Sequence, residues 1–370
     1  MASFDEVLKD CTKLGTKIPT SEYLESGKYP IIDQGQNDIA GYYDSDDGLF
    51  EDVPTIVFGD HTRVVKYVDK PCFLGADGVK LLCPLDKDIN CKYLFYQLSC
   101  ADIPNTGYNR HFKWVKALDF KIPSSDEQNH VVEVLDKVTE LISLRKQQLF
   151  KLDELVKARF VEMFGDSVAN TKNFPSTTLE TVMTVFPQNG LYKPQTDYVQ
   201  DDTGIPILRI DAFYNGKVTN WNTLKRLICS ETEIDRYLLK ENDIVINRVN
   251  SIEYLGKCAH IVGLKEKTVF ESNMMRFHMD EKKVNAVYVT EVLCTEDIYR
   301  QILRRAKKSV NQASINQEDV KSLEILVPPL SLQNQFAAFV ERVDQQKQTV
   351  QQSLEKLELM KKALMQEYFG

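Results

Sequence analysis

Two stretches of basic, amide and aromatic residues carry the clearest chemical signal in this sequence of 370 residues. Arginine and lysine neutralise phosphates, while asparagine, glutamine and arginine can pair with base edges, so this mixture favours a DNA-binding face. The alternative is a solvated helix end with ordinary surface charges. The candidates are Tyr108, Asn109, Arg110, His111 and Lys113 in the first stretch, and Arg304, Arg305, Lys307, Lys308, Asn311 and Gln312 in the second. Weaker candidates in predicted loops are Gln34, Gln36, Arg63, Lys66, Arg248 and Asn250.

No convincing catalytic motif accompanies these residues. Val327–Leu330 contains two prolines, as does the Asn/Asp-Pro-Pro-Tyr/Phe motif of amino-methyltransferases, but it lacks the polar and aromatic ends. No glycine-rich loop for a dinucleotide or a phosphate occurs. Glu281–Lys283 matches half of a nuclease site, but it lies in a charge run and is predicted to be a solvated loop. We therefore expect neither catalysis nor a cofactor or metal in this chain.

Composition narrows the class of protein further. A hydrophobic content of 43% and a charged content of 27% are typical of a soluble globular protein. No apolar run approaches the roughly 20 residues that span a bilayer, so no membrane association is predicted. Eight cysteines occur singly, which indicates reduced thiols and a cytoplasmic location. The net charge of −8 is unusual for a nucleic-acid binder, but a basic face can coexist with acidic surfaces elsewhere.

An internal repeat organises the chain around these clusters. Gln128-Asn129 recurs as Gln333-Asn334, and Phe164-Gly165 recurs as Phe369-Gly370, each 205 residues later. Residues 123–165 and 328–370 therefore align without a gap. Such a repeat implies a pseudo-twofold plan within one polypeptide.

Each copy is predicted to be a long helix, over about 126–163 and 331–368. The first contains no glycine or proline, and Ser124 or Ser125 can cap it. In an antiparallel pair the two fully apolar heptad rows face each other, while long basic side chains flank the seam. One row is Leu135, Ile142, Leu149, Val156 and Met163, the other is Phe336, Val343, Val350, Leu357 and Leu364, and the flanking residues are Arg145, Arg159, Lys347 and Lys361.

A region of short β-prone runs precedes each helix. The predicted strands are 29–32, 55–58, 64–67 and 80–83 in the first region, and 206–210, 243–246 and 259–262 in the second. We therefore predict an α+β fold with two globular units of mixed α/β structure, separated by a long antiparallel two-helix coiled coil. The predicted domains are residues 1–122, 123–165, 166–327 and 328–370.

This layout resembles the specificity subunits of type I restriction-modification systems. The resemblance rests on Ile122-Pro123 leading to Gln128, and on Leu326–Leu330 leading to Gln333. The repeated helices and the endings Glu-Met-Phe-Gly and Glu-Tyr-Phe-Gly complete it, so the resemblance covers nearly the whole chain. The first region has little counterpart to Asn173–Thr178, so its first strand is expected to be abbreviated.

The resemblance implies that each globular unit is a target-recognition domain for one half of a split, asymmetric DNA site. It implies a complex on double-stranded DNA with two methyltransferase subunits, which methylate adenine, and with restriction and translocase subunits. S-adenosylmethionine, ATP and magnesium are then expected in those partner subunits.

Two other classes of function remain open. A catalytic methyltransferase or nuclease is disfavoured by the missing motifs. A coiled-coil scaffold that binds only proteins fits the acidic net charge, but it does not require two elaborate globular units with basic clusters at matching places. Salt-dependent DNA binding would separate the DNA-recognition hypothesis from the scaffold hypothesis.

Deletion of one heptad from each helix in register tests the expectation that the coiled coil sets the gap between half-sites. Removing Arg145–Lys151 together with Val350–Lys356 preserves the apolar rows and shortens the rod by about 10 Å. This is roughly 3 bp at 3.4 Å per base pair, so the methylated motif should keep its half-sites but acquire a shorter spacer. Methylome sequencing of cells carrying the variant measures this gap. A folded variant that retains the original gap would show that the length of the coiled coil does not set the spacing of the half-sites.

Overall fold

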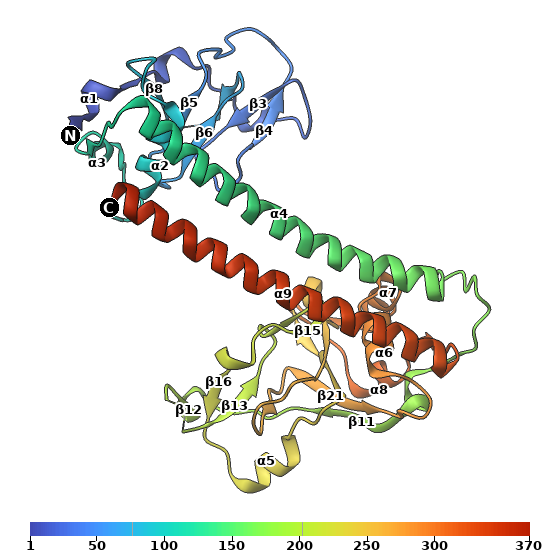
Figure 1. Cartoon of the computed structure of the whole chain (residues 1–370). Coiled ribbons are helices and arrows are strands. Elements are labelled where there is room, and N and C mark those ends of the chain that lie inside the picture. The colour runs from blue at the N-terminus through green and yellow to red at the C-terminus, as the bar shows by residue number, and fades with distance from the viewer. Residues whose placement is uncertain (76, 202) are drawn as a thin grey trace. The chain divides into compact units, whose positions relative to one another are not determined.

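The computed structural model describes residues 1–75, 77–201 and 203–370 and divides into two compact units. Unit 1 comprises Met1–Leu149 and Thr349–Gly370, and unit 2 comprises Phe150–Gln348. Two 40-residue helices, α4 (Ser125–Phe164) and α9 (Leu330–Phe369), each contribute residues to both units and appear green and red in Figure 1. The two predicted long helices are thereby confirmed.

Unit 1 is built on a four-stranded antiparallel sheet with the strand order β2-β8-β5-β6. A smaller sheet has the order β4-β3-β7, and β1 pairs with β9. The strands are β1 (Ala2–Ser3), β2 (Leu8–Asp10), β3 (Tyr29–Ile32), β4 (Gly41–Tyr43), β5 (Thr55–Gly59), β6 (Val65–Val68), β7 (Phe73–Leu74), β8 (Val79–Pro84) and β9 (Asp119–Phe120). The helices that precede α4 are α1 (Phe4–Val7), α2 (Cys91–Cys100) and α3 (Phe112–Val115).

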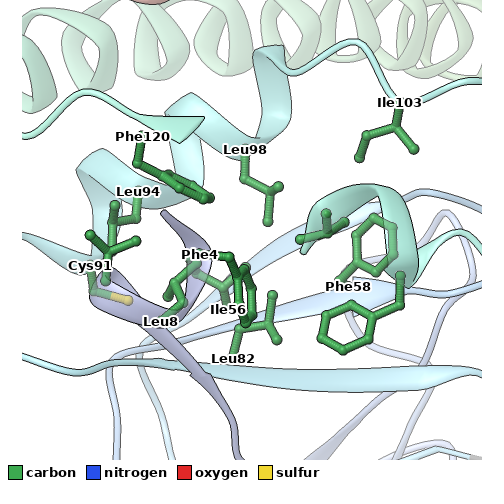
Figure 2. Close-up of a cluster of buried hydrophobic side chains, with 13 residues drawn as sticks. Phe4, Leu8, Ile56, Phe58, Leu82, Cys91, Leu94, Leu98, Ile103 and Phe120 are labelled. Carbon is green, nitrogen blue, oxygen red and sulfur yellow. The ribbon is translucent and has the colours of Figure 1, made fainter. Parts of the chain in front are cut away.

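The core of unit 1 forms where these short helices cover the sheet. Figure 2 shows Phe4 and Leu8 from the first segment packed with Ile56 of β5 and Leu94 of α2. Phe112 of α3 meets the ring of Phe4 edge-on at a centroid distance of 5.7 Å. Both faces of β5 are covered, since Ile56 and Phe58 enter this core while Val57 packs in a second cluster with Cys11 and Ile32, and all five residues of the strand are buried.

Unit 2 repeats this connectivity with insertions. Its central strand β17 (Asp243–Asn247) lies between β21 (Met274–Met279) and β19 (Cys258–His260), as β5 lies between β8 and β6. β13 (Ile205–Leu208) pairs in parallel with β20 (Val269–Phe270), as β3 pairs with β7. The other strands are β10 (Ser176–Thr178), β11 (Met183–Asn189), β12 (Tyr198–Val199), β14 (Phe213–Tyr214), β15 (Gly216–Val218), β16 (Lys225–Leu227), β18 (Val249–Asn250), β22 (Lys307–Lys308), β23 (Ala313–Ser314) and β24 (Glu324–Leu326). The helices are α5 (Glu231–Tyr237), α6 (Ala286–Leu293), α7 (Glu296–Arg305) and α8 (Gln317–Lys321).

All seven predicted strand segments contain a strand; the strand predicted over 29–32 has these ends, and the other six differ from the prediction at one or both ends. The strand predicted over 206–210 ends at Leu208, because the side chain of Glu271 accepts the Ile210 backbone N–H at 2.6 Å in place of a neighbouring strand. β1 has two residues and its counterpart β10 has three.

The antiparallel pairing of α4 and α9 is visible within each unit separately. In unit 1, Val131 and Leu135 pack with Leu364 and Tyr368, and farther along the Arg145 side chain donates a hydrogen bond to Ser353. In unit 2, Asp153 pairs with Lys347, and the Phe160 ring packs on Phe336 at 5.5 Å. In these contacts, higher residue numbers on α4 meet lower residue numbers on α9, as the predicted antiparallel pairing requires.

In each unit, one glutamine fixes the globular region to a long helix. Gln128 accepts the backbone N–H of Asn90 at 2.9 Å and donates to the Pro123 carbonyl. In unit 2, Gln333 accepts the Asn285 N–H at 2.9 Å and donates to the Pro328 carbonyl.

The partners of these glutamines are helix caps. The Asn90 side chain caps α2 and donates to Asn129 at 2.8 Å, while the Asn285 side chain caps α6 and donates to Asn334 at 3.0 Å. The repeated Gln-Asn dipeptide is therefore a docking device that occurs once in each unit.

The repeated Phe-Gly endings have a matching role. Phe164, at the end of α4, packs against Tyr288 of α6 at a centroid distance of 4.6 Å. Phe369, at the end of α9, packs against Tyr93 of α2 at 5.2 Å. Thus α4 ends against α6, whose capping residue Asn285 is bound by α9. In the same way, α9 ends against α2, whose capping residue Asn90 is bound by α4.

Replacing Gln333 with alanine should lower the free energy of unfolding of unit 2 by about 2–6 kcal/mol. The Gln333 side chain is fully buried, and its loss leaves the Asn285 N–H and the Pro328 carbonyl without partners, at about 1–3 kcal/mol each. Urea denaturation measures the change, with Gln346→Ala at an exposed position of the same helix as the control. Equal stability of the two variants would contradict the docking role of Gln333.

Candidate nucleic-acid interface

The two predicted clusters occupy equivalent places in the two units. In unit 1, the His111 N–H donates to the carbonyl of Asp60, the residue that follows β5, at 2.8 Å. In unit 2, the Ile315 N–H donates to the carbonyl of Arg248, the residue that follows β17, at 2.9 Å. Each cluster is therefore tied to the same end of the central strand.

In unit 1 this junction gathers candidates from three loops. The Gln34 side chain accepts the His61 N–H at 3.2 Å, and the His61 ring hydrogen-bonds the Asn109 carbonyl at 3.2 Å. The Tyr108 ring stacks on His61 with centroids 4.7 Å apart and 9° between the ring planes. Tyr108 is nevertheless 87% exposed, so the stacked pair presents one aromatic side chain to solvent.

Charge at this junction is mixed. Lys17 donates a hydrogen bond to Asp77 at 2.9 Å and lowers the pKa of its carboxyl group, and the nearby positive charge of Arg110 contributes a smaller decrease. The Gln34 side chain donates to the Asp77 carbonyl at 3.0 Å. Arg110 is exposed and therefore adds a positive charge beside the Gln34–His61–Tyr108 group.

For His111, Lys66 and Arg63 the structure corrects the expectation of a freely exposed, DNA-facing side chain. His111 is completely buried, and its ring hydrogen-bonds the Asp60 carbonyl at 3.0 Å. Lys66 is buried, where it donates to the Asn37 carbonyl at 2.5 Å and pairs with Asp33. Arg63 is partly buried in a left-handed turn and donates to the Ile103 carbonyl. These three residues hold the loops in place.

Gln36 and Lys113 are both exposed and belong to segments that reach this junction. Gln36 lies on the loop after β3, which also carries Gln34. Lys113 is the second residue of α3, and its ammonium group lies 5.2 Å from the Trp114 ring centroid. Both remain candidates for phosphate or base contacts.

In unit 2 the predicted residues come together on a three-stranded sheet. β22 and β23 form an antiparallel ribbon in which Lys307 opposes Ser314 and Lys308 opposes Ala313. β18 pairs with the other edge of β23, which brings Asn250 opposite Ala313. Lys307, Lys308, Asn311 and Gln312 are all exposed on or beside the turn of this ribbon.

The arginines of unit 2 differ in their surroundings. The Arg305 guanidinium donates to the hydroxyl and to the backbone carbonyl of Ser322, both at 3.0 Å. It also donates to the Gln301 carbonyl. This corrects its assignment as a free DNA contact, because its guanidinium anchors the base of the ribbon. Arg248 is half-buried and donates to the Ser272 carbonyl at 3.2 Å. Arg304, which precedes Arg305 in sequence, is exposed.

Sequence reasoning missed two kinds of residue at this interface. Asp60 organises the junction of unit 1, since its carboxylate also accepts the Phe112 N–H at 2.7 Å, but no local pattern identifies it. Val310, at the tip of the unit 2 ribbon, is 98% exposed. The sequence feature that could have identified Val310 is its place as a single apolar residue between two lysines and two amides.

The described part of the chain contains no grouping of side chains suited to a metal ion. Across residues 1–75, 77–201 and 203–370, no group of three His, Cys, Asp or Glu side chains could hold a metal ion. Glu281 is exposed and accepts a hydrogen bond from Asn242 at 2.8 Å, so the prediction of a solvated loop there is confirmed. Burial raises the pKa of the Asp243 carboxyl group, which His278 and Arg276 contact inside unit 2.

Within the same described ranges, no helix is both long and apolar enough to cross a lipid bilayer.

Comparison with protein families shows which family has this architecture. The family model of the type I restriction modification DNA specificity domain matches residues 5–154 and 174–359. The chain belongs to this family. Both matched segments contain a central strand, a cluster tied to its end and a part of one long helix, so the family assignment covers both candidate interfaces.

Individual relatives agree with this assignment. A protein of Methanocaldococcus jannaschii, named as a specificity subunit of the type I restriction enzyme MjaX, is 30% identical over 187 residues, which is 49% of this chain and 42% of that protein. The specificity subunit of the type I restriction enzyme EcoKI of Escherichia coli K12 is 25% identical over 243 residues, 62% of this chain and 50% of that subunit. The matches span about half the length of these curated relatives or less.

Solved structures share the fold. The S subunit of a type I restriction-modification system from M. genitalium aligns with a TM-score of 0.63 and 15% identity, covering 100% of this chain and 95% of that one. A chain from a structural study of type I complex assembly aligns with a TM-score of 0.52 and 14% identity, covering 98% and 94%. The expected two-unit fold with paired helices is confirmed.

Replacing His111 with alanine should loosen residues 105–110 without unfolding unit 1. The Asp60 carbonyl keeps its bond to the backbone N–H of residue 111 but loses the ring, and a net cost of about 0.5–1.5 kcal/mol for one hydrogen bond corresponds to roughly two- to twelvefold more frequent local opening. Hydrogen exchange of peptides covering this loop measures the effect, with the exposed neighbour Lys113→Ala as the control. Unchanged exchange in the His111 variant would show that its ring does not position the loop.

Proposed function

We propose that this chain is the DNA-recognition subunit of a type I restriction-modification complex. Each unit contacts one half of a bipartite, asymmetric DNA site, and the chain thereby directs adenine methylation or restriction by partner subunits. The supporting observation is the equivalent attachment of two different polar surfaces, through His111 to Asp60 and through Ile315 to Arg248.

The chemistry of both surfaces suits duplex DNA. Unit 1 offers amides and a positive charge around the exposed Tyr108 ring, and unit 2 offers paired lysines beside two amides. Lysines supply phosphate contacts that position a protein, whereas amides and arginine supply base contacts that specify sequence. Since the two surfaces differ, we infer that the two half-sites differ, unlike the palindromes that symmetric dimers read.

The chain itself is proposed to be non-catalytic. Its sequence lacks the motifs for methyl transfer, nucleotide binding and DNA cleavage that such a complex requires. S-adenosylmethionine, ATP and magnesium would accordingly bind to the partner subunits.

Two methyltransferase subunits and the restriction or translocase subunits are the proposed protein partners. Leu155 on α4 and Met360 on α9 are equivalent in the repeat, and both are more than 40% exposed. Paired apolar positions of this kind suit two similar docking surfaces, one on each long helix. The long helices would then both separate the half-sites and carry the methyltransferase subunits.

A lysine double variant tests the DNA interface of unit 2. Replacing Lys307 and Lys308 with alanine should weaken binding to all duplexes and reduce the slope of log affinity against log salt by roughly 0.9 for each lost phosphate contact. The measurement is fluorescence anisotropy of the assembled complex at several salt concentrations. Lys267→Ala with Lys282→Ala removes the same charge from exposed positions of unit 2 outside the ribbon.

The control variant should retain the original slope. If both double variants bind DNA like the unmodified complex, the ribbon is not part of the interface. If the unmodified complex shows no salt-dependent DNA binding at all, the chain is instead a scaffold for proteins.

A further inference from the structure

The tip of the β22–β23 ribbon presents an apolar side chain where every neighbour is polar. Val310 is 98% exposed, and the turn around it consists of Ser309, Asn311 and Gln312. Scattered exposed valines are common and need no function by themselves. Here the position matters, because Val310 lies between the lysines of one strand and the amides that lead into the other.

The ribbon holds this tip in a defined position. Both the backbone N–H and the side-chain hydroxyl of Ser309 donate to the Gln312 carbonyl, at 2.8 and 3.0 Å, and so close the turn. β18 extends the ribbon into a three-stranded sheet, and Arg305 anchors the residues just before β22 through Ser322. Val310 is therefore carried on a braced hairpin.

A two-stranded ribbon has the dimensions to enter the DNA major groove. Lys307 and Lys308, on the strand that leads to the tip, are exposed and can meet the phosphates that border the groove. A ribbon so oriented places residues 309–312 deepest, against the base edges. The charge of the strand and the position of the tip thus favour the same occupant, duplex DNA.

We propose that Val310 contacts the 5-methyl group of a thymine in the half-site bound by unit 2. This inference rests on the proposed function and adds a base feature to it. A valine side chain has no hydrogen-bond donor or acceptor, and the thymine methyl is the apolar group that the four bases display in the major groove. Asn311 and Gln312 beside it carry the amide that pairs with adenine, so an A·T pair satisfies both kinds of side chain.

The corresponding tip of unit 1 has different chemistry. Tyr108 carries a hydroxyl group and stacks on His61, so its exposed ring does not require a methyl partner. The inference is therefore confined to one half-site.

Deoxyuridine substitution tests the contact, because it removes only the methyl group of a thymine. The motif is first identified by methylome sequencing, and each thymine position of both strands in the unit 2 half-site is then replaced singly. Anisotropy competition with the assembled complex should show one position at which the substitution weakens binding about fourfold, the equivalent of one buried methyl group. With Val310→Ala, the same substitution should have little or no effect.

Val262→Ala provides a matched control, since Val262 is also an exposed valine of unit 2 but lies outside the ribbon. Its complex should retain the full deoxyuridine effect. A half-site without thymine, or equal deoxyuridine sensitivity in the unmodified and Val310→Ala complexes, would overturn the inference and leave the proposed function intact. Absence of specific binding by the unmodified complex would overturn the proposed function itself.

Discussion

The docking of a helix cap onto a long helix is the interaction on which the rest of this structure depends. The N-terminal N–H groups of a helix have no partner within that helix and must find one elsewhere. Asn90 and Asn285 solve this problem twice: their side chains cap α2 and α6, and their own N–H groups are accepted by Gln128 and Gln333. Each globular region thereby acquires a fixed attachment to α4 or α9.

A repeated framework leaves the reading surfaces free to differ. Each surface is joined to its unit by a bond between backbone groups, from the His111 N–H to the Asp60 carbonyl and from the Ile315 N–H to the Arg248 carbonyl, so the same link recurs although the side chains at these positions differ. Unit 1 uses this freedom for an aromatic stack, and unit 2 uses it for a ribbon with lysines and amides. Equivalent attachment with different chemistry is the physical basis for an asymmetric site.

Periodic features of the sequence could be predicted, whereas features decided by tertiary contacts could not. The heptad rows of α4 and α9 and the apolar runs of β5 and β17 each follow from a local pattern. His111 and Lys66 are polar residue types that usually lie on the surface, yet the fold buries both. The Asn90 and Asn285 caps escaped notice because their spacing differs from that of the helical repeat. The bases recognised depend on loop geometry, which could not be predicted from a single sequence.

The division of the chain also sets an order for its synthesis. Unit 2 is continuous, from Phe150 to Gln348, whereas unit 1 combines Met1–Leu149 with Thr349–Gly370. A ribosome therefore releases every residue of the second unit before it has released the helix turns that cover Tyr93 and Leu135 of the first. The N-terminal unit must wait with that apolar surface open, and it is completed last.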